Sequence, residues 1–368
     1  MTTLQLQTPA TTRKFWSGMS LFCLALLIAP VVATQLGGNY WVRIIDFALL
    51  YIMLALGLNI VVGYTGLLDM GFIAFYAVGA YLAALMASPH LLEVFPILGV
   101  WFPEGLHTSY LLIIPLAALV AAVCGMLLGA PTLKLRGDYL AIVTLGFGEI
   151  IRILMRNLDR PVNITNGAKG ITGVDTLNLF GLKFSGVYHW FGFKIPALWL
   201  WYYLLMLVII AIVFVCLRLQ HSRIGRAWHA IREDEDVARA MGINVRNYKL
   251  LAFAMGASFG GVAGALFGAF QGFVSPDSFT LQESIAVLAM VVLGGMGHIP
   301  GVILGAVLLT ALPELLRSQA APVQQALFGT VLIDPEVLRQ LFYGLALVLV
   351  MLVRPSGIWP VRHKEAKA

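Results

Sequence analysis

Long apolar runs separated by short polar segments dominate the chain. Ten of them approach the roughly 20 mostly apolar residues that an α-helix needs to cross a bilayer. Because backbone polar groups in lipid are satisfied inside helices, the pattern predicts an all-α integral membrane protein of about ten transmembrane helices within residues 18–353. The runs lie at 18–35, 43–62, 67–87, 110–130, 139–156, 196–217, 249–270, 284–296, 299–316 and 338–353.

The eighth and ninth runs are short, and the Gly-rich string GGMGHIPG, Gly294–Gly301, separates them. Glycines with Pro300 fit a kink, a tight hairpin or a re-entrant pair of half-helices. The spacing alone leaves these three alternatives open.

Composition supports lipid as the solvent of this chain. It is 60% hydrophobic and only 11% charged, whereas soluble domains carry about 25% charged residues. Cys23, Cys124 and Cys216 lie inside apolar runs, where they are expected as small core residues. The histidines show no metal-ligand spacing, and no basic stripe with aromatics indicates nucleic-acid binding. We therefore expect neither a metal, a bound cofactor nor a nucleic-acid partner.

The first run follows Arg13 and Lys14 and could imitate a signal peptide, but it has no clean A-x-A site and is interpreted as a span.

Lys and Arg favour cytoplasmic segments. With the N-terminus inside, most of them fall in the tails 1–17 and 354–368 and in the loop 218–249. The loop 157–195 is then periplasmic, and its Gly- and Asn-rich composition suggests a small structured cap.

The loop 218–249, called the charged loop below, carries six positive and four negative residues between His221 and Lys249. RAWHAIREDEDVARAM, Arg226–Met241, predicts one short amphipathic helix near 227–241, with Gly242 as its C-cap. Trp228, Ile231, Ala238 and Met241 are expected to share much of one face. Such a helix could lie on lipid, where consecutive acids fit poorly, form a solvated loop, or dock into a groove of a partner.

DVARAMG, Asp236–Gly242, resembles the EAA---G core of ABC importer permeases, with Asp in place of Glu and without the downstream I-x-LP. The longer string GRAWHAIREDEDVARAMGI, Gly225–Ile243, resembles the cytoplasmic loop of LivM-type permeases of branched-chain amino-acid importers. Four further stretches resemble this family in the same order, so that the resemblance covers about residues 43–353. They are 57–85, 133–154, 163–174 and 291–306.

The resemblance implies a permease subunit of an ATP-driven importer of Leu, Ile and Val in the bacterial inner membrane. Its implied partners are a second homologous permease, two cytoplasmic ATPases and a periplasmic amino-acid-binding protein. The sequence has no GxxxxGK[ST] motif, so ATP and Mg are expected on the ATPase chains and this chain is not expected to be an enzyme. The helix near 227–241 would couple to the ATPase. Its candidate residues are Arg226, Ala230, Ile231, Glu233, Asp234, Asp236, Ala238, Met241 and Gly242.

A second set of candidates lies inside the apolar runs, where each member either packs helices or lines a pathway. Glycines recur every four residues from Gly256 through Gly260 and Gly264 to Gly268 and form one smooth helix face. Intramembrane charges are costly and often functional. Asp69 is one such charge, and Glu149 stands three residues before Arg152, as in a helical ion pair.

Three alternatives to the main interpretation remain open. Related permeases import urea or short amides, which the quoted strings leave possible. An ion-coupled carrier would need buried ionisable residues and inverted repeats, and no convincing repeat is present. A structural subunit without a transport path is the third. NGAKGITG, Asn166–Gly173, is either a simple turn or a contact for the binding protein.

Overall fold

The computed structural model describes residues 26–35, 38–95, 106–132, 135, 137–179, 181–190 and 193–328, with positions 337, 341, 344–345, 348–349, 352–353 and 357–359. The expected tail 1–17, most of the tail 354–368 and most of the run 338–353 lie outside these residues. Of the first run, a helix Leu26–Gln35 is described.

Each of the other eight apolar runs forms a helix, and most lie close to their expected bounds, although the ninth continues from its expected end at 316 to Phe328. The helices are α2 (Asn39–Asn59), α3 (Ile73–Met86), α6 (Tyr110–Thr132), α7 (Asp138–Asn157), α8 (Ala197–Gln220), α11 (Val245–Gln271), α12 (Leu281–Gly294) and α13 (Ile299–Phe328). A π-helical segment, η1 (Ile60–Tyr64), extends α2, and a short helix α4 (His90–Val94) follows α3.

The described residues contain five helices that are long and apolar enough to cross a membrane, together with three shorter apolar helices. Helix α7 is not among them because Asp138, Glu149, Arg152 and Arg156 interrupt its apolar pattern. The expected run 139–156 is therefore an amphipathic helix. The structure supports a mostly helical, multi-pass membrane protein.

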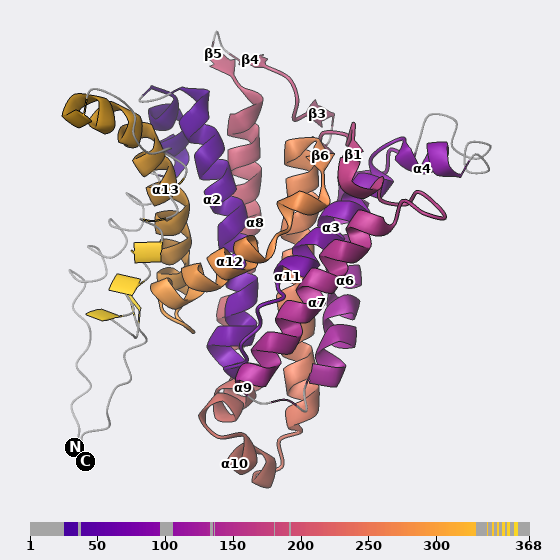
Figure 1. Ribbon diagram of the computed structural model, residues 1–368, viewed down its shortest axis with the longest axis vertical. Coiled ribbons are helices and arrows are strands. Elements are labelled where there is room, and N and C mark those ends of the chain that lie inside the picture. Colours follow the sequence, from indigo (N-terminus) through magenta and orange to yellow (C-terminus); the bar gives the residue numbers. More distant parts are fainter. Residues whose placement is uncertain are drawn as a thin grey trace, which may run out of the picture.

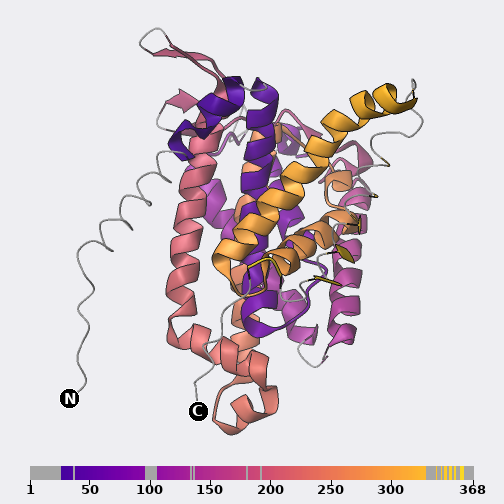
Figure 2. The same ribbon diagram turned by 90° about the vertical axis from the view of Figure 1, so that its left-hand side faces the viewer.

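Helices α2, α3 and α11 form the core, and α6, α7, α8, α12 and α13 surround it (Figures 1 and 2). Helix α11 packs against α6, α3 and α2, while α2 also contacts α8, α12 and α13. The outward faces of α6 and α8 carry mostly apolar large side chains, as expected for contact with lipid. They include Leu111, Leu112, Leu119, Leu207, Ile210 and Phe214.

The glycines of α11 bring helix backbones into direct contact inside this chain. A Cβ on Gly256 would lie 2.9 Å from the Gly57 carbonyl oxygen of α2, and one on Gly264 would lie 2.1 Å from the Tyr76 carbonyl oxygen of α3. Gly260 and Gly268 also face α3. Of the two alternatives for this glycine face, the structure supports internal helix packing.

The Gly-rich string between the eighth and ninth runs forms a helical hairpin. Helix α12 ends at Gly294 and α13 begins at Ile299, with Gly295 and Gly297 at φ 110° and 88° in the turn. A Cβ on Gly294 would lie 2.3 Å from the Gly301 carbonyl oxygen, so the two helices cross closely. Figure 1 shows α12 crossing α2 obliquely, and a kink within one continuous helix is ruled out.

Short strands form the cap expected over residues 157–195, and they correct the all-α prediction. β1 (Ile171–Thr172) pairs antiparallel with β6 (Phe273–Val274), which follows α11. Two further antiparallel pairs are β2 (Asn178–Leu179) with β3 (Leu182–Lys183), and β4 (Tyr188–Trp190) with β5 (Phe193–Ile195). Two 3₁₀ turns, η2 (Gly167–Lys169) and η3 (Pro276–Ser278), complete this end.

The segment Asn163–Gly173 is a turn held by its own side chains. The Asn163 side-chain oxygen accepts a hydrogen bond from the Asn166 backbone N–H at 2.9 Å, and the Asn166 side-chain amide donates to the Gly170 carbonyl at 2.7 Å. These bonds explain why Asn166 adopts the left-handed conformation with φ 59°. A contact of this turn with a binding protein stays a prediction.

Candidate functional site

The charged loop contains two helices rather than the single one expected near 227–241. They are α9 (Arg223–Glu233) and α10 (Glu235–Ala240), and both lie at the end of the molecule opposite the cap strands (Figure 1). Asp234 has extended backbone angles, and its carboxylate accepts from the Asp236 and Val237 N–H groups at 2.8 and 3.0 Å. Aspartate is a strong N-cap residue, so it starts a new helix where helix composition alone predicts continuation.

Hydrogen-bonded caps define where α9 begins and where α10 ends. The Ser222 hydroxyl accepts from the Gly225 N–H at 3.1 Å and begins α9. After α10, the Gly242 N–H donates to the Arg239 carbonyl at 3.0 Å, and the Ile243 N–H donates to the Ala238 carbonyl at 3.1 Å. This is a Schellman motif with Gly242 at φ 83°, which confirms the expected C-cap.

Helix α9 is fixed by Trp228, whose side chain is completely buried. Its indole N–H donates to the Tyr248 carbonyl of α11 at 2.8 Å. Its ring stacks on Tyr64 of η1, with centroids 6.3 Å apart and planes inclined by 18°. The helix is therefore in contact with the ends of two core helices, α2 with its extension η1, and α11.

Arg232 connects the loop to the hairpin turn between α12 and α13. Its guanidinium donates to the carbonyl oxygen of Gly63 in η1. A Cβ on Gly297 would lie 3.1 Å from a guanidinium nitrogen of Arg232 and 3.2 Å from the Gly63 carbonyl oxygen. In addition, the Gly297 N–H donates to the Asn59 side-chain oxygen at 2.8 Å. The charged loop, the end of α2 and the Gly-rich turn therefore meet at one joint.

An ion pair between side chains connects helix α10 to α11. The Lys249 ammonium group, whose side chain is 4% exposed, lies 2.7 Å from a Glu235 carboxylate oxygen. Arg239 pairs with Glu235 at 3.0 Å and with Asp236 at 3.1 Å. A nearly buried charge is costly to strand without its partner, so the Lys249–Glu235 pair holds α10 against the core.

The structure divides the expected coupling residues into a buried and an exposed group. Ile231 and Ala238 are buried together with Val245, and Ala230 packs beside them. Met241 is 79% exposed, which corrects the expectation that it shares a face with Trp228, Ile231 and Ala238. The exposed members are Arg226, Glu233, Asp234, Asp236, Met241 and Gly242. Val237, 58% exposed, joins Met241 as an apolar side chain on the outer surface of the loop.

Sequence reasoning missed several residues of this region: Asn59, Gly63, Trp228 as an anchor, Arg232, Glu235, Lys249 and Gly297. One signal was available in the string GLNIVVGY, because a lone Asn inside an apolar run requires a hydrogen-bond partner. The partner itself, Gly297, lies 238 residues further along the chain, and no local pattern specifies it.

Asp69 belongs to the loop between η1 and α3. It is 2% exposed, and one carboxylate oxygen accepts from the Gly71 N–H at 2.9 Å. The same loop is held by α7, because the Thr144 hydroxyl accepts from the Met70 N–H at 3.0 Å. This arrangement supports a structural role for Asp69 in shaping the turn that starts α3.

Helix α7 presents charges on its outward flank. Glu149 pairs with Arg152 through two contacts of 3.0 and 3.1 Å and a third, shorter one, as the spacing predicted. Arg152 and Arg156 also approach Asp277 of η3 at 3.9 and 4.0 Å. These side chains are partly exposed, and lipid is a poor environment for them. The flank of α7 beside η3 is therefore suited to a polar neighbour, unlike the apolar faces of α6 and α8.

Comparison with known proteins identifies the family of this chain. Residues 40–351 match the sequence profile of the family described as branched-chain amino acid transport system / permease component. The LivM high-affinity branched-chain amino acid permease protein of Escherichia coli (strain K12) is 42% identical, over 94% of this chain and 76% of that protein. A probable LivM permease protein of Methanocaldococcus jannaschii is 26% identical, over 84% of this chain and 90% of its own length.

A relative of the second permease type also matches. The LivH permease protein of Salmonella typhimurium is 26% identical, over 84% of this chain and 90% of its own length. No solved structure matches the chain. The chain belongs to the family of permease components of branched-chain amino acid transport systems.

Proposed function

We propose that this chain is the transmembrane permease subunit of an ATP-driven importer that moves leucine, isoleucine and valine from a periplasmic binding protein to the cytoplasm. Relatives that cover most of its length are named for branched-chain amino acid transport. In this proposal the protein spans the bacterial inner membrane several times, with both termini and the charged loop in the cytoplasm and the strand-bearing cap in the periplasm.

One observation supports this function more than any other: the charged loop is exposed on one side and anchored to the core on the other. Its outer surface offers Val237 and Met241 among charged side chains, a combination that fits helix-in-groove docking to another protein. Its inner surface joins the core through Trp228, Arg232 and Lys249. A push on α10 from a partner would thus reach α2, α11 and the α12–α13 turn together.

The partners follow from the same layout. Two ATPase chains that hold ATP and Mg would dock on the charged loops of this chain and of a second, homologous permease; a LivH protein among the relatives supports such a pair. The charged flank of α7, with Glu149, would face that second permease and the substrate path rather than lipid. No cofactor is assigned to this chain itself.

The test is ATP-dependent uptake by the assembled complex. The chain is tagged and purified from its native host, and co-purifying proteins are identified by mass spectrometry. The complex is then reconstituted in vesicles with labelled leucine. We expect an ATPase, a second permease and uptake that requires both ATP and the binding protein. Uptake driven by an ion gradient without ATP would instead support a secondary carrier, and uptake of urea or short amides but not leucine would reassign the substrate.

A further inference from the structure

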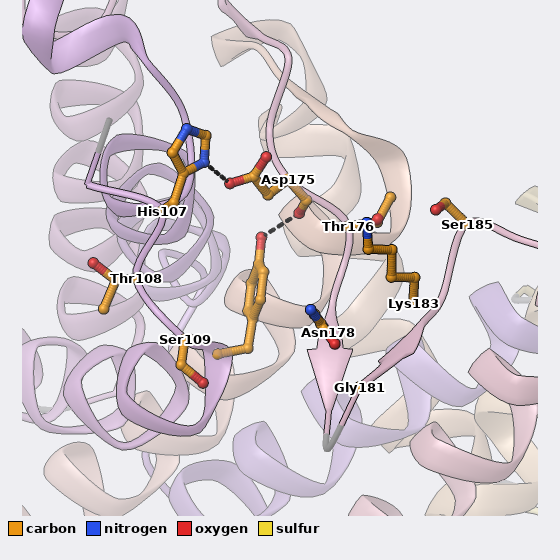
Figure 3. Close-up of a pocket in the computed structure, with 10 residues that line it drawn as sticks. His107, Thr108, Ser109, Asp175, Thr176, Asn178, Gly181, Lys183 and Ser185 are labelled. Carbon is orange, nitrogen blue, oxygen red and sulfur yellow. Dashed lines mark hydrogen bonds and ion pairs between the residues drawn. The ribbon is translucent and has the colours of Figure 1, made fainter. Parts of the chain in front are cut away.

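A polar pocket opens at the cap end of α6 and has no part in the coupling described above. It has a volume of about 550 Å³ and is bordered by the segment leading into α6 and by the strands β2 and β3 with their flanks (Figure 3). Its lining residues are His107, Thr108, Ser109, Tyr110, Asp175, Thr176, Asn178, Gly181, Lys183 and Ser185. Among the described lining residues, none belongs to α7, η3 or α12, so the pocket lies apart from the charged flank of α7.

The pocket carries both signs of charge on a fixed backbone. Asp175 pairs with a His107 ring nitrogen and keeps its side chain 41% exposed. The Tyr110 hydroxyl holds the Asp175 backbone by donating to its carbonyl at 2.8 Å. On the other border, the Lys183 N–H donates to the Tyr188 hydroxyl at 2.8 Å, which fixes β3 beneath the exposed Lys183 side chain. A ligand with an ammonium and an anionic group matches this lining.

The position of the pocket points to the lipid surface. Helix α6 has 23 residues, and at 1.5 Å per residue it spans roughly 35 Å, enough to cross the hydrocarbon core. Its first turn therefore lies at headgroup depth. Ser109 directly precedes α6 and lies three residues before Leu112, and Leu111 and Leu112 are each 57% exposed in the first turn of that helix. A molecule in the pocket would continue directly onto an apolar, lipid-facing surface.

We propose that this pocket binds the headgroup of an outer-leaflet phospholipid that carries both a primary ammonium and a phosphate, namely phosphatidylethanolamine. The phosphate would contact Lys183 and the hydroxyl groups of Thr108 and Ser109. The ammonium would donate to the Asp175 carboxylate, which can accept bonds beyond the one from His107. The acyl chains would lie along the exposed leucines at the start of α6. A free amino acid such as leucine shares the headgroup's pair of charges, but its side chain is far shorter than an acyl chain and cannot extend along the exposed leucines of α6.

The proposal is tested by lipid selectivity. The chain, purified within its complex, is exchanged into nanodiscs of phosphatidylcholine, phosphatidylglycerol or either lipid mixed with phosphatidylethanolamine, and retained lipids are counted by native mass spectrometry. Phosphatidylcholine has the same net charge but no ammonium N–H, and phosphatidylglycerol has no cation. We expect selective retention of phosphatidylethanolamine and a higher melting temperature in its presence. Equal retention of the three lipids would overturn the proposal.

Variants assign the retention to this pocket. Because a hydrogen bond to a charged group contributes about one decade in affinity, Lys183→Gln and Asp175→Asn should each weaken retention of phosphatidylethanolamine about ten-fold. Matched controls are Lys194→Gln and Asp159→Asn, which replace exposed residues that do not line the pocket. Lys183→Gln removes no described contact of the fold, so its result stands even if Asp175→Asn folds poorly. Retention unchanged in Lys183→Gln, or displacement of the lipid by leucine or by the binding protein, would contradict the assignment.

Discussion

Two single residues of the charged loop, Gly242 and Asp234, set the bounds of α10. Gly242 sits in the left-handed region at φ 83°, and a Cβ there would meet nothing within 4 Å. The constraint at this position is thus conformational and not steric. Asp234, eight residues earlier, acts through its hydrogen bonds to the first N–H groups of α10. Together these two residues fix where α10 begins and ends.

Gly242→Val should therefore impair coupling while leaving the membrane core intact. A β-branched residue in the left-handed region costs about 1–2 kcal/mol, and that cost falls on the Schellman cap that positions α10. We expect ATP hydrolysis by the assembled complex to continue while leucine uptake per ATP falls several-fold. Gly242→Asn is the matched control, because asparagine tolerates this conformation. Normal coupled transport by Gly242→Val would show that the cap is dispensable.

At the scale of elements, the central packing depends on small residues in α11. Gly264 lets the backbones of α11 and α3 touch. Gly125 of α6 approaches α11 closely from another side, because a Cβ on Gly125 would lie 2.6 Å from the Ala257 methyl group. At Gly146 of α7, by contrast, a Cβ would meet nothing within 4 Å. Glycine therefore permits close helix contact at some positions, such as Gly264, and borders open space at others, such as Gly146.

This contrast gives a stability prediction. Gly264→Val would force α11 and α3 apart, and overpacking of this kind costs about 1–3 kcal/mol or more. We expect a clear fall in the melting temperature of the purified chain in detergent. Gly146→Ala should instead leave the melting temperature unchanged or raise it, since alanine favours a helix by about 0.5–1 kcal/mol. If both variants melted at the same temperature, the close approach in α11 would not contribute to stability.

The exposed surface of α10 and of Met241, the residue that follows it, is where we expect the ATPase to bind. Met241→Asp and Val237→Asp place charge on the two apolar side chains that we assign to the ATPase groove. Each should reduce co-purification of the ATPase about ten-fold or more, because a buried apolar anchor typically contributes over 1 kcal/mol to an interface. Val187→Asp, an exposed valine in the cap, is the control and should retain the ATPase. Full recovery of the ATPase with Met241→Asp would contradict docking at this surface.

Across the whole molecule, the hydrophobic pattern predicted the features that depend on local sequence, namely the positions of the helices and of the cap. The apolar runs located the helices because each must satisfy its backbone within itself, and the composition of residues 157–195 indicated a structured cap. The break at Asp234 was missed because helix propensity runs through it and only the capping geometry interrupts it. The joint of Arg232, Gly63 and Gly297 was also missed because it depends on tertiary packing. Arg232 is 169 residues from Gly63 along the chain, and Gly297 is 238 residues from Asn59.

The joint at Arg232 is the contact through which we expect motion of the charged loop to move the core. The most direct measurement is the ratio of leucine imported to ATP hydrolysed by the reconstituted complex carrying Arg232→Ala. Arg223→Ala, an exposed arginine on the same helix, is the matched control. We expect the Arg232→Ala complex to retain the ATPase chains and to hydrolyse ATP, but to import about ten-fold less leucine per ATP, because a hydrogen bond from a charged group to the core is lost. An unchanged ratio in Arg232→Ala would contradict this expectation.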